Sequence, residues 1–394
     1  MITDVTDRKF FLLIAFIGAI AIMGSTMSKT PVLPLFAADL GATPTEIGWI
    51  VIASTLPGVL ISFPAGAMAD AFGKRAVIIS SLFVFATAPF LYLSVTNAWE
   101  LMAVRFYHGF ATAIFGTVAA AAIAERYPQA RGTMLSTFSS ATLVGRSVSP
   151  FLGGFLISVA SFQSVYVACA ISGVLALLIG LVLPRERVRS ASSVGTQQEQ
   201  QPSMIRSLRE VIANRGIMLT SMVEAAQLLA FGALEAFLAL YAASVGIPPW
   251  QIGIMLGVQL IGIVLIKPMM GRLSDHYGRR AVILPGLLLG AAGTALIPFT
   301  GNVLALCALS LAFGTGHAMV TSATSALVAD LTRAGKFGAS IGVLRTVMDV
   351  GQMIGPLATG FLIGYFGYFV AFPAIAAVLV LSSLAFIVAP NLGA

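Results

Sequence analysis

Twelve stretches of about 20 largely apolar residues follow one another along this chain, and they constrain its fold more than any other feature. A helix needs about 20 residues to cross the hydrocarbon core of a membrane, so each stretch is long enough to span it. The stretches begin near Phe10, Thr45, Ala76, Ala98, Thr133, Gln163, Gly216, Trp250, Ala281, Val303, Phe337 and Tyr368. The sequence therefore predicts an all-α membrane protein with twelve transmembrane helices.

The composition excludes the main classes of soluble protein. Of the 394 residues, 58% are hydrophobic and only 9% are charged, whereas about a quarter of the residues of a soluble protein are charged. A soluble enzyme, a nucleic-acid-binding protein and a disordered protein are therefore excluded. Cys169 and Cys307 lie in apolar stretches without metal-binding spacing, and no nucleotide-binding glycine loop is present. We expect no cofactor, no metal and no use of ATP.

One long polar segment interrupts the short loops. It runs from residue 185 to 215 and is rich in Ser, Gln and charged residues, which is typical of a linker. Its last part has apolar residues at helical spacing: Met204, Ile205, Leu208, Val211 and Ile212. This pattern favours an amphipathic helix on the membrane surface over a merely solvated linker. We therefore predict three parts: a six-helix bundle over 1–184, a linker over 185–215 and a second bundle over 216–394.

The distribution of Lys and Arg predicts the orientation of the chain. Five of the 22 lie inside predicted spans: Lys29, Arg105, Arg146, Lys267 and Arg345. The other 17 all fall at the N-terminus or in alternate loops, which places them on one side of the membrane. Because positively charged loops stay in the cytoplasm, we expect both termini and the linker inside, in the inner membrane of the cell.

Two motifs recur in the second half of the chain. The segment Gly271–Arg280 repeats the glycine, aspartate and cation spacing of Gly66–Arg75 at an offset of 205 residues. A glycine–proline segment from Gly145 recurs from Gly351, at an offset of 206. Two independent motifs at nearly one offset indicate a duplicated six-helix unit, which is common in transporters. The fold expected is two pseudo-symmetric six-helix bundles around a central cavity.

The repeated Gly-x3-Asp-x2-Gly-(Lys/Arg)-Arg loop in a twelve-span chain resembles the major facilitator superfamily, and the resemblance covers nearly the whole chain. Weaker matches are Pro31-Val-Leu-Pro34, the arginine motif Arg105-x3-Gly109, and the glycine–proline motif typical of the family's drug and metabolite proton antiporters. The last motif departs from the pattern, because Ser149 replaces a glycine and Arg146 is unusual there. The resemblance implies secondary transport by alternating access, with Arg105 and neighbouring His108 tuning a proton site.

The two repeated motifs imply a gate and a hinge. In the family, the loop motif latches the cytoplasmic ends of the bundles; here it comprises Gly66, Asp70, Gly73, Lys74, Arg75, Gly271, Asp275, Gly278, Arg279 and Arg280. The alternative is a solvated positive loop without a latch. The hinge or packing residues are Gly145, Pro150, Gly153, Gly154, Gly351, Gly355 and Pro356, since small residues allow helices to approach closely and proline permits a kink.

Charged residues inside a membrane are costly, so they indicate function or a fixed ion pair. Glu224 and Glu235 are eleven residues apart on one predicted helix and share a face. Arg345 and Asp349 are four apart, within reach of an ion pair. The proton-coupling candidates are Glu235, Asp349, Glu224, Arg105 and His108, ranked with Glu235 and Asp349 first among the acids; the alternative is structural pairing. The substrate-cavity candidates are Arg146, Arg345, Gln227 and Lys29. As alternatives, the side chains of Lys29 and Lys267 can extend to the membrane interface, and His317 suits a position in the packed core.

Three functions remain open. The first is proton-coupled export of small amphipathic organic compounds, with a small-molecule substrate, protons and the lipid bilayer as partners and a monomer as the active form. The second is an uptake symporter or exchanger for an organic anion, because the predicted spans contain five cations and only three acids. The third is a membrane sensor without transport. None of the three is an enzyme.

Overall fold

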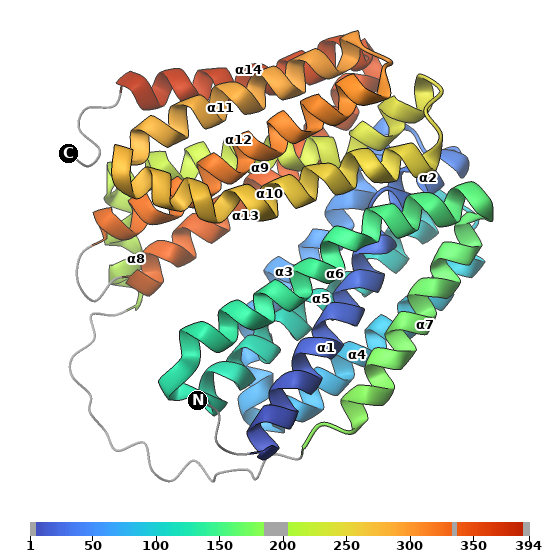
Figure 1. The fold of residues 1–394 in the computed structure, drawn as a ribbon, viewed down its shortest axis with the longest axis vertical. Helices are drawn as coiled ribbons and strands as arrows, with labels where there is room; N and C mark the ends of the chain where they lie inside the picture. The colour runs from blue at the N-terminus through green and yellow to red at the C-terminus, as the bar shows by residue number, and fades with distance from the viewer. Residues whose placement is uncertain (1–4, 185–203, 333–336, 389–394) are drawn as a thin grey trace. The chain divides into compact units, whose positions relative to one another are not determined.

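The computed structural model of the chain describes residues 5–184, 204–332 and 337–388, without the side chains of residues 5–6, 62–63, 70, 204–208 and 337–338. In these ranges all regular elements are helices (Figure 1). Twelve helical segments among the described residues are long and apolar enough to cross a membrane, which confirms the predicted fold class.

The first six spans begin close to where the sequence places them. They are α1 (Val5–Met27) with the short α2 (Val32–Asp39); α3 (Pro44–Phe72); α4 (Lys74–Leu91) with the 3-10 helix η1 (Tyr92–Ser94); α5 (Ala98–Arg126); η2 (Pro128–Ala130) leading into α6 (Arg131–Val159); and α7 (Phe162–Leu181). The largest difference from the predicted starts is at the first span, which begins at Val5 rather than Phe10.

The remaining helices repeat this order after a short additional helix. They are α8 (Met204–Ala213), α9 (Arg215–Ser244), α10 (Pro249–Tyr277), α11 (Arg279–Leu296) with η3 (Ile297–Phe299), α12 (Val303–Leu331), α13 (Phe337–Phe366) and α14 (Tyr368–Val388). Asn97 and Asn302, which occupy equivalent positions in the repeat, cap α5 and α12 by accepting hydrogen bonds from backbone N–H groups of the first turn. The repeat therefore extends to the helix ends.

Internal contacts divide the chain into two compact units. Unit 1 contains Met1–Ser192 and Pro248–Gly257, and unit 2 contains Ser193–Ile247 and Val258–Ala394. Within unit 1, α1 packs along α6 and α4 along α7; within unit 2, α9 packs along α13 and α11 along α14 (Figure 1). The boundaries 1–184, 185–215 and 216–394 stay predictions, because residues 185–203 lie outside the described part of the chain.

The additional helix α8 belongs to unit 2 by its packing. Val211 is buried in an apolar cluster with Ile217, Val328, Val343 and Leu344, whereas Ile212 on the same helix is exposed. A helix is thus present in this segment, and protein covers Val211. Its place on the membrane surface stays a prediction. The side chains of the other predicted apolar positions, 204, 205 and 208, lie outside the described residues.

Candidate transport site

Unit 2 contains a buried carboxylate at the centre of a charged cluster. Glu224 on α9 is only 4% exposed, and the Thr324 hydroxyl on α12 donates a hydrogen bond of 2.7 Å to its Oε2 atom. The charges of Lys267 on α10 and Arg345 on α13 both act on this carboxylate. Side chains from three other helices therefore converge on this acid, and we call Glu224, Thr324, Lys267 and Arg345 the Glu224 cluster.

The Glu224 cluster suits reversible protonation. Burial favours the neutral acid, whereas a nearby cation favours the carboxylate. Lys267 and Arg345 are themselves exposed, unlike the carboxylate. A small change in the distance from Glu224 to either cation therefore changes its affinity for a proton.

The other two acids predicted for proton coupling lie in less enclosed surroundings. Asp349 is half-buried on α13, and the charge of Arg345 acts on it, but these two described residues form no direct salt bridge. Glu235 is half-buried further along α9, and its side chain takes part in an interaction with another residue. Their role in coupling stays a prediction. Glu224 is the most enclosed of the three acids, and the predicted order of Glu235 and Asp349 before Glu224 stays a prediction.

Gln227 and His317 lie inside the packed part of unit 2. Gln227 is fully buried beside Gly290 of α11, and neither amide atom has a hydrogen-bond partner among the described residues. The ring of His317 lies 4.8 Å from that of Phe231, measured between centroids. His317 thus has the aromatic surroundings of a core histidine, but its Nδ1 atom, like the Gln227 amide, has no hydrogen-bond partner among the described residues.

Unit 1 contains a buried arginine among aromatic residues. Arg105 on α5 donates hydrogen bonds from Nη1 to the Tyr92 hydroxyl at 3.0 Å and to the Ser28 hydroxyl at 3.3 Å. Tyr92 also bonds His108 Nδ1 at 3.2 Å and stacks on Tyr166, with ring centroids 4.4 Å apart. Arg105 and His108 thus belong to one polar network, which is how a buried hub holds helices together.

Sequence reasoning missed Tyr92, Tyr166 and Ser28 as members of this network. Their signal is a hydroxyl in an otherwise apolar stretch, because a buried hydroxyl usually finds a hydrogen-bond partner. Arg105 Nε, His108 Nε2 and the Tyr166 hydroxyl have no partner among the described residues. The network therefore retains capacity for further hydrogen bonds.

The remaining cavity candidates lie in unit 1 in different settings. Arg146 is exposed on α6, one residue after Gly145. Lys29 is half-buried in the turn between α1 and α2, and it takes part in an interaction with another residue. Both stay predictions as substrate contacts.

The repeated loop motifs make matching contacts inside each unit. In unit 1, Lys74 Nζ lies 2.5 Å from Glu125 Oε2, and in unit 2 Arg279 Nε lies 2.9 Å from Asp330 Oδ2. Glu125 and Asp330 are separated by the same offset as the motifs, so the partners repeat together with them. Arg279 also pairs with Asp275. The side chain of Asp70 lies outside the described residues, and the predicted latch between bundles stays a prediction.

The second arginine of each motif holds the end of another helix. Arg75 Nη2 donates to the carbonyl of Leu181 at 2.7 Å, at the end of α7. Arg280 Nη2 donates to the carbonyl of Phe386 at 2.9 Å, near the end of α14. These carbonyls have no partner within their own helix, so a cation there stabilises the helix end. Gly73 and Gly278, with φ of 84° and 91°, supply the sharp turn before each arginine.

Arg280→Gln is expected to lower stability, because a hydrogen bond to a charged donor contributes about 1.5–3 kcal/mol. Thermal unfolding of purified protein in detergent measures this, with Arg272→Gln, an exposed cation of the same unit, as the control. If Arg280 acted only as part of a latch between the bundles, the two variants would have the same unfolding temperature.

The glycine–proline segments bring two helix pairs into backbone contact. A Cβ atom at Gly145 of α6 would overlap the carbonyl oxygen of Ala19 on α1. A Cβ atom at Gly351 of α13 would overlap the carbonyl oxygen of Ala225 on α9. Ala19 and Ala225 are separated by the same offset as the two glycines, so this contact is also duplicated. Both segments thus lie at close helix contacts, while their function as a hinge stays a prediction.

Ser149 explains the departure from the glycine–proline pattern. Its hydroxyl donates a hydrogen bond of 2.8 Å to the carbonyl of Met23. At the repeated position, Gly355 packs directly against the carbonyl of Leu229, which is the equivalent of Met23 in the repeat. The serine side chain thus occupies space in unit 1 that is closed in unit 2, and α9 and α13 approach more closely there.

The remaining predicted hinge residues lie on the same two helices. Gly153 and Gly154 continue the small-residue side of α6, where Gly154 faces the backbone of Pro249 and Gly253 within unit 1. Pro150 and Pro356 lie within α6 and α13 without ending them. Each proline removes one backbone donor from its helix.

Comparison with known proteins identifies the family of this chain. The sequence model of the Major Facilitator Superfamily matches residues 14–250 and 224–392. The chain belongs to the Major Facilitator Superfamily. Members of this superfamily are transporters that bind small molecules in a lipid bilayer, so the protein is a multi-pass membrane transporter and not an enzyme.

Two named superfamily members are similar over most of the chain. The uncharacterized MFS-type transporter MJ1560 of Methanocaldococcus jannaschii is 25% identical over 338 residues, covering 86% of this chain and 87% of the relative. The quinolone resistance protein NorA of Staphylococcus aureus is 26% identical over 333 residues, covering 84% of each.

Solved structures of the superfamily share the fold. The nucleoside transporter NupG gives a TM-score of 0.79 at 16% identity, covering 96% of this chain and 98% of that one. A bacterial homologue of the human lysosomal transporter Spinster gives 0.78 at 16% identity, covering 98% and 95%. At this identity the likeness concerns the fold alone.

Proposed function

We propose that the protein is a proton-coupled exporter of small amphipathic organic compounds that works by alternating access. The observation that carries the proposal is the Glu224 cluster, in which a buried carboxylate receives a hydroxyl hydrogen bond and lies near two cations. A coupled carrier needs an acid whose proton affinity changes with conformation, and burial beside two cations supports Glu224 in that role. The similarity to a quinolone resistance protein supports a drug-like substrate.

The test is gradient-driven transport of a quinolone in proteoliposomes with an imposed pH gradient. We expect accumulation in the compartment from which protons leave, and we expect a protonophore to abolish it. If the quinolone accumulates to the same level with and without a pH gradient, in vesicles that still bind it, proton coupling is contradicted but export is not.

Uptake of an organic anion is the second candidate. It is favoured by the exposed cations Lys267 and Arg345 of the Glu224 cluster, and by Arg105, whose hydrogen bonds go to hydroxyls. The direction of substrate movement in inside-out vesicles distinguishes the two: an exporter accumulates substrate inside such vesicles, and an uptake carrier depletes it.

We also propose that both termini lie in the cytoplasm and that the protein resides in the inner membrane, which the one-sided distribution of Lys and Arg supports. In a variant with Cys169 and Cys307 replaced by Ala, a cysteine introduced at Ser193 is expected to resist an impermeant thiol reagent added to intact cells. A cysteine at Thr300, on the opposite side, is expected to react. Equal labelling at both positions contradicts this orientation.

A further inference from the structure

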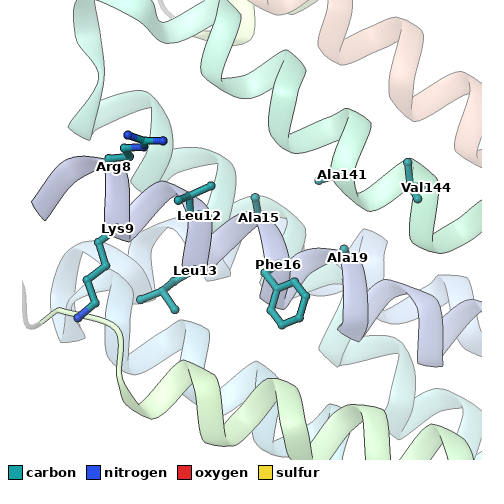
Figure 2. A pocket seen from close by; sticks show the side chains of 9 residues that line it. All are labelled: Arg8, Lys9, Leu12, Leu13, Ala15, Phe16, Ala19, Ala141 and Val144. Atoms are coloured by element: carbon teal, nitrogen blue, oxygen red, sulfur yellow. The ribbon is translucent and has the colours of Figure 1, made fainter. Parts of the chain in front are cut away.

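A groove with charged side chains at one end runs along α1 in unit 1. It has a volume of about 910 Å³ and lies between α1 and α6 (Figure 2). It is lined by Arg8, Lys9, Leu12, Leu13, Ala15, Phe16, Ala19, Ala141 and Val144. The lining residues of α1 run from Arg8 to Ala19, eleven residues further along the helix, which is about 16 Å along its axis.

The groove is apolar over most of its length. Leu12, Phe16 and Val144 are more than half exposed, at 58%, 55% and 65%, and the small residues Ala15 and Ala141 leave the hollow between them. Among the described residues, no side-chain hydroxyl, amide or carboxylate lines it. Sites for small polar ligands contain a few polar groups that fix the ligand's orientation, so this groove suits a flexible hydrocarbon chain better.

Two cations lie at the N-terminal end of the groove. Arg8 and Lys9 are exposed, and Figure 2 shows them extending to opposite sides of α1. The adjacent Asp7 does not neutralise them, because its Oδ1 atom accepts a hydrogen bond of 2.7 Å from Arg126 Nε. The groove therefore complements a molecule with an acidic head and an apolar tail.

The repeat shows a partial difference between the two units. Met218 and Val347, the repeat equivalents of Leu12 and Ala141, pack beside the apolar cluster that contains Val211 of α8. Met222 and Val350, the equivalents of Phe16 and Val144, are exposed as in unit 1. In unit 2, α8 thus packs near one end of the corresponding surface, whereas in unit 1 a groove runs along α1 from Arg8 to Ala19.

We propose that this groove binds an acidic phospholipid of the surrounding membrane. One acyl chain lies along Leu12, Phe16 and Val144, and Arg8 and Lys9 bind the phosphate of the head group. The N-terminal end of a membrane-spanning helix lies at the depth of the head groups, and a cation near an anionic membrane surface attracts acidic lipid. The lipid fills the space between α1 and α6.

The test is photocrosslinking in nanodiscs of phosphatidylcholine that contain a trace of phosphatidylglycerol with a diazirine on one acyl chain. Peptide mass spectrometry is expected to find label on residues 12–19 and 141–144. In Arg8→Gln/Lys9→Gln this labelling is expected to fall at least about fivefold. Arg209→Gln/Arg272→Gln, which removes two exposed cations of unit 2, is the matched control and is expected to label like the wild type.

Two further measurements separate the outcomes. Excess unlabelled phosphatidylglycerol is expected to displace the probe from the wild type, and phosphatidylcholine is not; this test holds even where the charge variant fails to fold. Ala141→Phe fills the groove without changing charge and is expected to reduce labelling. Equal competition by both lipids would overturn the proposal, and so would displacement of the probe by a quinolone, which would make the groove a substrate site.

Discussion

Replacing Glu224 with Gln is expected to abolish the response of transport to a pH gradient while leaving a folded, substrate-binding protein. Gln has nearly the same size as Glu, and its amide oxygen can still accept the hydrogen bond from Thr324. It cannot bind or release a proton. Lys267 and Arg345 lose a counter-charge, but both are exposed.

The size of the effect follows from the coupling between proton and substrate. Coupling between two binding events is typically about 1–3 kcal/mol, or about 5–150-fold in affinity. We therefore expect quinolone affinity to change by such a factor between acid and alkaline pH in the wild type. In Glu224→Gln we expect the affinity to be independent of pH, and gradient-driven accumulation in proteoliposomes to fall to the level seen without a gradient.

Glu100→Gln is the matched control, because Glu100 is exposed at the start of α5 and its substitution should leave coupling unchanged. Glu235→Gln and Asp349→Asn test the other acids, which we also predict to be needed for coupling. Loss in Asp349→Asn but not in Glu224→Gln would move the coupling site to α13. Retention of gradient-driven accumulation in all three variants would remove the physical basis of proton coupling.

The positions of the spans could be predicted from the sequence because apolar length is a local property. The start near Ala98 coincides with the start of α5, and the start near Phe337 coincides with that of α13. The repeat could be predicted as well, since Gly66–Arg75 and Gly271–Arg280 share one spacing. Neither inference depends on which helix faces which.

Partners in space could not be predicted, because they depend on how helices rotate and slide against one another. Arg105 contacts Ser28 across 77 positions of sequence, and nothing local in the motif indicates that contact. Sequence spacing also allows salt bridges that the side-chain conformations do not make. Arg345 and Asp349 are four residues apart on α13, and still they form no direct salt bridge.

The surroundings of an acid show the same limit. Position along a helix indicates the depth of an acid in the membrane, but not the groups that surround it. The surroundings of Glu224 depend on Thr324, which lies 100 residues later, and on cations from two further helices. Convergence of three other helices on one carboxylate has no signature in a single stretch of sequence.

Gly351→Ala is expected to destabilise the protein strongly for so small a change. The added methyl group would overlap the carbonyl oxygen of Ala225, which is backbone and cannot rotate away as a side chain can. Either α9 and α13 separate or the chain distorts, and overpacking of this kind costs about 1–3 kcal/mol. Close helix approach through small residues is a main source of helix association in membranes, so separation also weakens neighbouring contacts.

Gly342→Ala, on the same helix, provides the matched control. A Cβ atom at Gly342 has nothing within 4 Å, so this substitution adds no clash. Alanine is favoured over glycine in a helix by about 0.5–1 kcal/mol, and the variant is expected to be slightly more stable than the wild type. Thermal unfolding in detergent should therefore shift in opposite directions for the two variants, and a common shift would contradict the packing argument.

The same pair of variants separates packing from a hinge. If Gly351 only packs, Gly351→Ala lowers the unfolding temperature, and transport per folded molecule is preserved below that temperature. If α9 and α13 must also slide or bend at this contact during each transport cycle, turnover falls even where the protein is fully folded. Because the carbonyl of Ala225 lies against Gly351, any sliding of the two helices has to move that carbonyl past a residue that lacks a side chain. We therefore expect turnover and stability to fall together in Gly351→Ala and neither to fall in Gly342→Ala.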